Sequence, residues 1–416
     1  MRVLLSDGSG LTARQCATRL AADDHVVDVL SPDPLCLCRF TRSVRRVHRV
    51  PAYGPDPTAW LDAALEVYRS GHYDALLPTQ EQVAALSWAK CRLDRAGVAT
   101  AVPSFAALAA VQDKISALAT LRRLGIPQPP AATGIEGWDS FPAFVKDPIG
   151  TASGGVRRVT TPAQLQSAAA ERPVLVQAAV DGPLIMCQSV FDHGSLVAFH
   201  ANERTAEGAG GGASHKTSVS MPDARRWFEI LGGDLAWHGA LSADLVLGDD
   251  GPVFIDVNPR LVEPQNAYFS GVDLVRAMME LATGGHPTPQ PEGRAGVATH
   301  QLLLCVLGAA QHGAGRLGVA TEILHAARGN HHYLASREEL LPLARDPKSL
   351  VPLAMAAVAT IASPASWSWF TSGSVSNYAL TANGWDQLVR RDPCPEHDCA
   401  GPSPGPSRRS GGQTVR

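Results

Sequence analysis

The chain has 416 residues, a formal net charge of −3 and a hydrophobic fraction of 45%. This composition provides for a sizeable core, and the length predicts two or three domains. The near balance of 36 basic and 39 acidic residues gives no general positive field, which argues against nucleic acid as the main partner. The N-terminus carries Asp7 where a signal peptide needs a long apolar stretch, and the apolar runs are too short to cross a bilayer. We therefore expect a cytoplasmic protein without a membrane span.

The first hundred residues alternate between short apolar strands and helices. The expected strands are 2–6, 25–31, 75–78 and 100–102, and the expected helices are 12–22, 58–70 and 81–96. Such alternation predicts a parallel sheet covered by helices on both faces. We therefore assign residues 1–103 to a doubly wound α/β domain.

The pattern changes after residue 103, where two helices are expected before a β-rich stretch. The helices are 105–111 and 114–124, and the strands are 141–146, 157–160, 174–180, 185–192, 196–203, 240–247 and 253–258. Residues 104–284 are therefore expected to form an α+β module. A C-terminal α/β region of mixed helix and strand is expected at 285–390, followed by a disordered tail at 391–416 that is rich in Pro, Gly, Ser and Arg.

An early glycine pattern allows two interpretations. Gly8, Gly10 and Ala13 follow a predicted strand and match the G-x-G-x-x-A fingerprint of dinucleotide-binding turns. However, the acid that should end the second strand is displaced, because Asp28 lies inside that strand. A turn of a doubly wound domain that merely tolerates glycine is the preferred interpretation, and dinucleotide binding stays open as the alternative.

A stronger signal lies in two apolar strands separated by the turn sequence Gly-Asp-Asp-Gly at 248–251. A hairpin centred near Asp250 places Asp244 opposite Asp256, and the alternation of side chains puts Asn258 on the same face. Two carboxylates at such short range repel each other unless a cation lies between them. Two acids and an amide oxygen suit Mg²⁺, the usual companion of nucleoside triphosphates. An exposed acidic hairpin face is the alternative.

A lysine and a glycine-rich loop lie upstream of this hairpin. Lys146 ends a strand and is followed by the small residues of 150–155, whose backbone N–H groups could surround phosphates. Lys114 begins a helix about thirty residues earlier, and Gln177 supplies one amide in an otherwise apolar strand that suits a purine ring. A mobile surface hairpin is the alternative for the loop.

Together these features resemble the ATP-grasp superfamily, in which the second metal-bearing strand commonly reads Glu-x-Asn-x-Arg. Here Asp256, Asn258 and Arg260 occupy those three positions, with aspartate in place of glutamate. The resemblance implies a Rossmann-like domain at 1–103 and a two-lobed ATP-grasp module, with a nucleotide lobe at about 104–180 and a metal and substrate lobe at about 181–284. It also implies ATP and Mg²⁺, or Mn²⁺ in its place, as cofactors.

The resemblance further implies individual roles. Nucleotide-binding positions would be Lys114, Lys146, Gly150, Ser153, Gly154, Gly155, Gln177, Ala178 and Val180, and metal ligands would be Asp244, Asp256 and Asn258. Arg204, Lys216 and Arg260 are the catalytic candidates, because they could neutralise charge on a transferring phosphoryl group. The glycine-rich residues 205–215 between the first two are expected to form a substrate lid. Glu263, His215 and His238 are weaker candidates for acid–base chemistry.

The expected function is that of an ATP-dependent ligase, which activates a small carboxylate as an acyl phosphate and joins it to an amine or ammonia. A carboxylase or carbamoyl-phosphate-like enzyme that uses bicarbonate is the closest alternative, and a nucleotide-binding regulator without turnover is an alternative of another class. The expected partners are small molecules, not nucleic acid or a membrane, and a homodimer is compatible with the sequence. Three of the 5 lysines in the chain fall in this proposed site.

Overall fold

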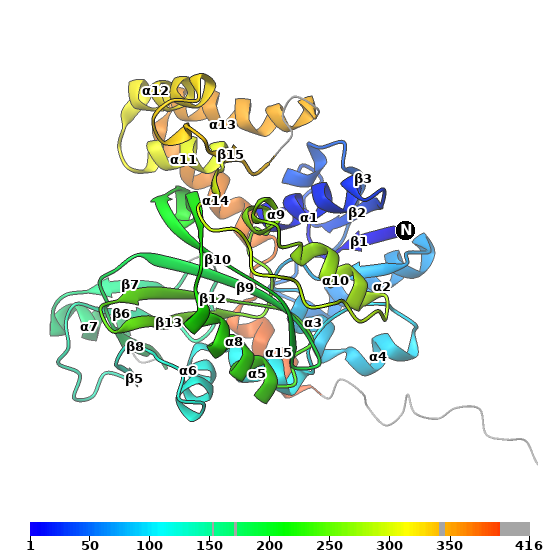
Figure 1. Cartoon of the computed structure of the whole chain (residues 1–416), viewed down its shortest axis with the longest axis horizontal. Helices are drawn as coiled ribbons and strands as arrows, with labels where there is room; N and C mark the ends of the chain where they lie inside the picture. Colours follow the sequence, from blue (N-terminus) through cyan, green and yellow to red (C-terminus); the bar gives the residue numbers. More distant parts are fainter. Residues whose placement is uncertain (152–153, 170–172, 341–345, 392–416) are drawn as a thin grey trace, which may run out of the picture.

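A computed structural model describes residues 1–151, 154–169, 173–340 and 346–391, and the strands within these ranges form three sheets. The N-terminal elements are β1 (Arg2–Leu5), α1 (Leu11–Ala22), β2 (Val26–Ser31), β3 (Val44–Arg49), α2 (Pro57–Gly71), β4 (Ala75–Leu77), α3 (Val83–Trp88) and α4 (Lys90–Arg95). The strands pair in parallel in the order β3-β2-β1-β4, which confirms the α/β, Rossmann-like arrangement. Figure 1 shows how these helices and strands are arranged.

Two details of this sheet differ from the expectation. β3 was not expected, because its alternation of valine with arginine and histidine, Val-Arg-Arg-Val-His-Arg, is that of an exposed edge strand. Residues 100–102 do not form a strand, although the neighbouring Ala99 accepts a backbone hydrogen bond from Leu76 at 2.9 Å. The chain therefore runs beside β4 at this point without extending the ladder.

A small antiparallel sheet lies within the residues expected to form the nucleotide lobe, and this name is kept for it below. Its elements are α5 (Phe105–Gln112), α6 (Lys114–Arg123), β5 (Ala131–Thr133), β6 (Ala143–Lys146), β7 (Val156–Val159), α7 (Pro162–Ala169) and β8 (Leu175–Ala178). The strand order is β5-β8-β6-β7. A cluster of alanine, valine and leucine side chains from β6, β7, α7 and β8 fills the space under the sheet.

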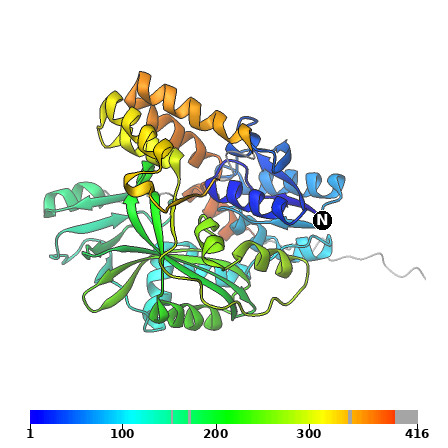
Figure 2. The same ribbon diagram turned by 45° about the horizontal axis from the view of Figure 1, so that its top comes forward.

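The largest sheet carries the predicted acidic hairpin. Its elements are β9 (Leu184–Asp192), β10 (Ser195–Glu207), β11 (Ala213–Val219), α8 (Pro222–Asp234), β12 (Gly239–Gly248), β13 (Gly251–Asn258), α9 (Gln265–Ser270), α10 (Leu274–Ala282), β14 (Ala298–His300) and β15 (Arg337–Glu338). The strand order is β13-β12-β9-β10-β11-β14-β15. Figure 2 shows this sheet between the N-terminal domain and the small sheet of the nucleotide lobe.

The C-terminal region is mainly helical in the described residues. Its helices are α11 (Leu302–Gln311), α12 (Gly315–Arg328), α13 (Leu350–Ala362), α14 (Trp367–Ser376) and α15 (Ala382–Arg390). Its two short strands, β14 and β15, extend the large sheet and form no sheet of their own. None of the helices in the described ranges is long and apolar enough to span a membrane.

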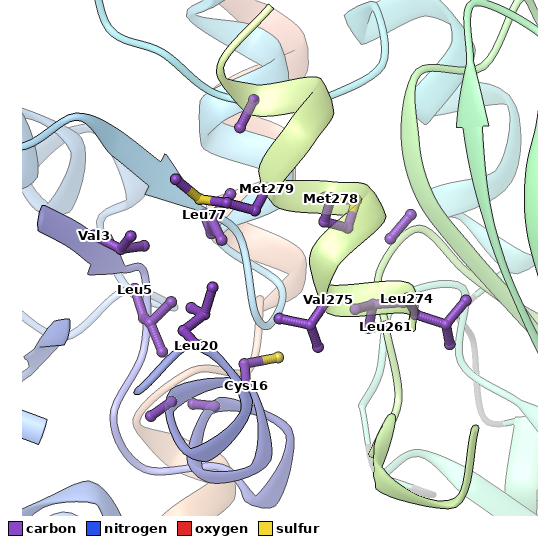
Figure 3. Close-up of a cluster of buried hydrophobic side chains, with 14 of the residues drawn as sticks. Val3, Leu5, Cys16, Leu20, Leu77, Leu261, Leu274, Val275, Met278 and Met279 are labelled. Atoms are coloured by element: carbon purple, nitrogen blue, oxygen red, sulfur yellow. The ribbon is translucent and has the colours of Figure 1, made fainter. Parts of the chain in front are cut away.

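One hydrophobic core joins the N-terminal domain to α10. Leu5, Cys16 and Leu77 of the N-terminal domain contribute to the same buried cluster as Val275 and Met279 of α10 (Figure 3). These side chains are at most 5% exposed, and burial of each large one stabilises the fold by about 1.5–3 kcal/mol. This shared core fixes the position of the N-terminal domain relative to the large sheet, and therefore relative to the acidic hairpin.

Candidate active site

The hairpin places the two acids as the sequence predicts. Asp244 of β12 pairs with Asp256 of β13, and Ser242 pairs with Asn258. The register shifts by one residue beyond this point, where Leu245 pairs with Phe254 and leaves Ile255 as an unpaired extra residue. This bulge brings the two acids into register, because the turn-proximal ladder by itself would place Asp244 opposite residue 255.

The electrostatics of the acid pair favour a cation. Burial and the neighbouring Asp256 carboxylate raise the pKa of Asp244 to about 6, against the opposing effects of Arg260 and Lys146. The two carboxylates are thus held together at a cost that a divalent cation would remove. With Asn258 on the same face, the donor set is all oxygen, which fits Mg²⁺.

Lys146 crosses from the nucleotide lobe to this hairpin. Its Nζ donates to the backbone oxygen of Ile255, the bulge residue, at 2.6 Å and to Oε1 of Gln177 at 2.8 Å. Burial lowers the pKa of Lys146, while Asp256 raises it and Lys114 lowers it further. Both hydrogen-bond partners are neutral, so the ammonium keeps its charge available for an anion. Gln177 positions this lysine.

The described glycines of the predicted phosphate loop are closely packed, and Gly150 lies beside Lys114. The Lys114 Nζ donates to the backbone oxygen of Gly150 at 3.2 Å. A Cβ at Gly150 would lie 2.3 Å from the backbone oxygen of Gly154, and Gly155 has a φ of +77°, so these positions require glycine. Ser153, the remaining predicted loop contact, lies outside the described residues.

The expected purine contacts lie where the two lobes meet. Ala178 ends β8, and its N–H donates to the backbone oxygen of Pro130 at 2.8 Å. Val180 follows it and lies against the hairpin turn, since a Cβ added to Gly248 would be 3.2 Å from Val180 Cγ1. The segment is therefore placed between the small sheet and the acidic hairpin, as a nucleotide-binding slot requires.

The sheet adds one buried polar residue that the sequence interpretation missed. Asp244 pairs with Met186 of β9, which pairs with Asn202 of β10, so Asn202 lies on the same sheet face as the acids. Asn202 is 1% exposed, and neither its Oδ1 nor its Nδ2 has a hydrogen-bond partner among the described residues. Such an orphaned amide points to a ligand. The alternation of Asn202 and Arg204 along β10 was the available signal.

Arg260 is held by a residue from the N-terminal domain. Its Nε donates to Oε1 of Glu81 at 2.9 Å, and its Nη2 donates to Oδ1 of Asn258 at 3.4 Å. Glu81 also accepts a hydrogen bond from Gln112 of α5 at 3.1 Å. Sequence reasoning missed Glu81, which lies more than 170 positions before Arg260. Through this ion pair the N-terminal domain orients the arginine beside the metal-ligand candidate.

Arg204 and Lys216 are paired neighbours on β10 and β11, but their surroundings differ. Arg204 is partly exposed, forms an ion pair with Glu207 at 3.2 Å, and lies two residues beyond Asn202 on β10, which puts it on the sheet face of the acid pair. Lys216 is 1% exposed and forms ion pairs with Glu263 and, at 2.9 Å, with Glu339. Since two carboxylates neutralise it, the geometry gives its expected catalytic role no support and favours a structural one.

The expected substrate lid at 205–215 is instead the end of a β-hairpin. β10 continues to Glu207, a short turn follows, and β11 begins at Ala213. The turn packs on α11, since a Cβ at Gly208 would lie 2.9 Å from the Cβ of Leu304. The lid prediction was wrong because the glycines serve close packing against a helix that the sequence pattern alone did not place there.

Comparisons with known proteins agree with this geometry. Residues 111–264 match a family model described as an ATP-grasp domain. The chain contains an ATP-grasp domain. No curated protein sequence matches the chain at a significant level, whereas many solved structures share its fold.

Three solved structures illustrate the likeness of fold. The biotin carboxylase domain dimer of 2-oxoglutarate carboxylase from Hydrogenobacter thermophilus, in complex with MgADP, ADP and bicarbonate, is 14% identical, with a TM-score of 0.57 over 71% of this chain and 73% of that one. N5-carboxyaminoimidazole synthetase from Staphylococcus aureus is 12% identical, with a TM-score of 0.56 over 72% and 82%. An L-amino acid ligase from Bacillus licheniformis is 14% identical, with a TM-score of 0.53 over 69% and 75%.

The early glycine turn is covered by the C-terminal region. Ser374 donates to the backbone oxygen of Ser9 at 2.8 Å, and Asn377 donates to its Oγ at 3.1 Å. A Cβ at Gly10 would lie 2.3 Å from Nε2 of Gln80. The glycine is therefore needed for close packing, which favours the interpretation of this segment as a structural turn.

The weaker acid–base candidates lie away from the acidic hairpin of the ATP-grasp domain. His215 packs among His300, His332 and Tyr333 of the C-terminal region, and burial lowers its pKa to about 4. His238 precedes β12 at the end opposite to the hairpin turn. Glu263 forms an ion pair with Lys216. The geometry supports none of the three as a catalytic acid or base.

Proposed function

We propose that the chain is an ATP-dependent, ADP-forming ligase that activates a small carboxylate and joins it to an amine or ammonia. The observation that carries this proposal is the half-buried pair of Asp244 and Asp256 in direct register, beside the Lys146 ammonium, which donates to the backbone oxygen of the bulge residue Ile255. The ATP-grasp domain match at 111–264 supports it.

The residues divide into three groups by location. Lys114, Lys146 and the glycine-rich loop would bind the phosphates, and Gln177, Ala178 and Val180 would contact the purine. Asp244, Asp256 and Asn258 would hold Mg²⁺, which when bound neutralises charge on the phosphates. Arg204, Arg260 and Asn202 would face the carboxylate substrate, where the guanidinium groups stabilise developing negative charge. Transfer of the γ-phosphoryl group to the carboxylate gives an acyl phosphate, which the amine attacks with loss of phosphate.

We also propose the division of the chain at 1–103, 104–284 and 285–390, with the ATP-grasp lobes meeting near 180. Two contacts qualify the last boundary. β14, at Ala298–His300, pairs with β11 and extends the ATP-grasp sheet. α15 packs on the N-terminal domain, where Trp385 is buried in the same cluster as Trp60 of α2. The C-terminal region is thus proposed as an extension that is packed against both other parts of the chain.

A bicarbonate-using enzyme is the second candidate. It is favoured by the likeness to the biotin carboxylase domain, whose structure contains bicarbonate with MgADP. Both reactions place a carboxylate-like acid opposite the γ-phosphate, so the acid pair and the lysines do not separate them. The identity of the second substrate separates them, because bicarbonate would stimulate ADP release without any organic acid.

The test is ADP release from MgATP with a panel of amino acids and other small carboxylates, each with and without amines, and with bicarbonate. We expect stimulation by one organic acid and amine pair, and its abolition in Asp256→Asn. Asp249→Asn changes an exposed acid in the turn of the same hairpin and is the matched control, which should keep full activity. Tight ATP binding without ADP release for every combination would contradict the ligase proposal.

A further inference from the structure

A second cluster of ligand-type side chains lies at the end of the large sheet that is remote from the acidic hairpin. Asp192 ends β9, and His193 begins the two-residue turn to β10. The register of β12 with β9 pairs Gly239 with Phe191, so His238, the next residue outward, lies across from Asp192. His286 reaches the same point from the connection after α10, through a hydrogen bond from its Nδ1 to Oδ2 of Asp192 at 2.7 Å.

The distances within this cluster suit a single metal ion. One ligand atom from each of Asp192, His193 and His238 lies within 4.8 Å of the other two. Asp192 Oδ1 and His238 Nδ1 are 3.6 Å apart, close to the separation of about 3.3 Å that tetrahedral zinc with bonds of about 2.0 Å imposes on two ligands. The rings of His193 and His238 stack with their centroids 4.2 Å apart.

The two facing atoms lack any other partner. Neither Oδ1 of Asp192 nor Nδ1 of His238 makes a hydrogen bond within the described ranges, although both atoms are shielded from solvent. Leaving two such polar atoms unsatisfied costs free energy, and a cation between them would satisfy both. The remaining carboxylate oxygen, Oδ2, accepts from His286 and is thereby oriented, as outer-sphere partners of metal ligands commonly are.

The local backbone holds the ligands in place. His193 has a φ of 46° and Gly194 a φ of 90°, which are the positive values of a tight two-residue hairpin turn. The N–H of Gly194 donates to the backbone oxygen of Trp237 at 2.7 Å, which ties the turn to the segment that carries His238. Lys90 is the nearby cation, and Asp94 holds its ammonium at 2.6 Å.

We propose that Asp192, His193 and His238 form a zinc-binding site, with His286 as the partner that orients the Asp192 carboxylate. Two imidazoles and one carboxylate are ligands that Zn²⁺ prefers over Mg²⁺. His238 and Asp244 are six positions apart along the chain, about 20 Å in an extended strand, so this site is separate from the proposed magnesium site. Bound zinc joins the β9–β10 turn to the start of β12 and, through His286, to the connection that leads to the C-terminal region.

The test is calorimetric titration of the full, untagged chain with zinc chloride after removal of metals with a chelator. We expect one strong zinc site per chain. His193→Asn and His238→Gln should each weaken it by more than about 100-fold, and His286→Ala by about 10-fold, since loss of an outer-sphere partner costs 10–100-fold. Asparagine adopts positive φ more readily than most residues, so His193→Asn preserves the turn.

His312→Ala removes an exposed histidine at the end of α11 and is the matched control, which should bind zinc like the wild type. Asp256→Asn should also keep zinc binding, which separates this site from the nucleotide site. Substitution with Co²⁺ provides a second readout, because tetrahedral coordination gives strong visible absorption that His238→Gln should abolish. The proposal would be overturned if the wild type bound no zinc, or if His193→Asn and His238→Gln bound zinc as tightly as the wild type.

Discussion

Two buried lysines of this protein have opposite surroundings. Lys146 donates to a backbone carbonyl and to Gln177, both neutral, and burial lowers its pKa. Lys216 contacts the carboxylates of Glu263 and Glu339, and these anions raise its pKa in spite of burial. The Lys146 ammonium thus lies at the acidic hairpin without a carboxylate hydrogen-bonded to it, so its charge is available to a ligand. The Lys216 ammonium is neutralised by two carboxylates.

The difference shows that burial of a lysine does not by itself indicate function. The Lys216 cluster joins three parts of the chain, because Glu339 also accepts from Gln15 of α1 at 2.9 Å and from Thr299 of β14 at 2.7 Å. Lys146 joins only the two lobes of the ATP-grasp domain. We therefore expect Lys216 to affect stability and Lys146 to affect turnover.

The largest expected effect is on stability, in Lys216→Met. Removal of the cation leaves Glu263 and Glu339 buried without compensation, which should lower the free energy of unfolding by about 3–5 kcal/mol. Urea denaturation followed by circular dichroism measures this. Lys348→Met removes an exposed lysine and should change stability little. A variant of Lys216 with wild-type stability and no turnover would restore the catalytic assignment.

Lys146→Met should have the complementary effect. Loss of an ammonium that stabilises phosphate charge should lower kcat for ADP formation by about 10²–10³-fold, while the midpoint of urea denaturation moves much less than in Lys216→Met. Steady-state kinetics with saturating MgATP provide the measurement. If kcat stayed within a few-fold of wild type, the buried ammonium would have no part in the reaction.

The stability of the folded protein should also depend on pH through Glu338, which is the neighbour of Glu339 in the Lys216 cluster. Burial raises its pKa from 4.5 to about 7, so between these values the folded protein holds a proton that the unfolded chain has lost. Stability should therefore fall as pH rises from about 4.5 to 7 and then level off, by up to about 3 kcal/mol at about 1.4 kcal/mol per pKa unit.

Glu338→Gln should reduce that decline. Urea denaturation at pH 5 and pH 8 for both proteins gives the measurement, and the difference between the two declines isolates Glu338 from the other titrating groups. Equal declines in wild type and variant would show that this carboxyl does not titrate in that range.

The smallest expected effect concerns Gln177, which positions Lys146. Gln177→Ala removes one acceptor from the ammonium, and hydrogen bonds to charged groups contribute about 1.5–3 kcal/mol, so kcat/KM for MgATP should fall by about 10- to 150-fold. Gln166→Ala alters an exposed glutamine on α7 of the same lobe and should leave kcat/KM for MgATP unchanged. A loss of stability without a change in kcat/KM would assign Gln177 to the fold alone.

Local patterns in the sequence predicted a good part of this structure. The parallel N-terminal sheet and the two helices that begin at Phe105 and Lys114 follow from the periodicity and turn residues of short segments. Each of these strands and helices carries its own periodicity and turn residues, which indicate its local conformation.

Other features depended on contacts over long separations, which no local pattern contains. The ion pair of Glu81 with Arg260, the packing of α11 on the glycines expected to form a lid, and the two acids around Lys216 are of this kind. The bulge at Ile255 also escaped the pattern, and the acid pair came into register through it.

The sequence by itself therefore determined which residues are candidates for the ATP-grasp chemistry, because their types and spacing lie within single strands, loops and one hairpin. Only the tertiary structure decided which charges remain available. Lys114, Lys146 and Lys216 look alike in the sequence, but the third is matched by Glu263 and by Glu339, a residue from the far end of the chain. The physical reason is that the free charge of a buried group depends on every neighbour that the fold brings to it.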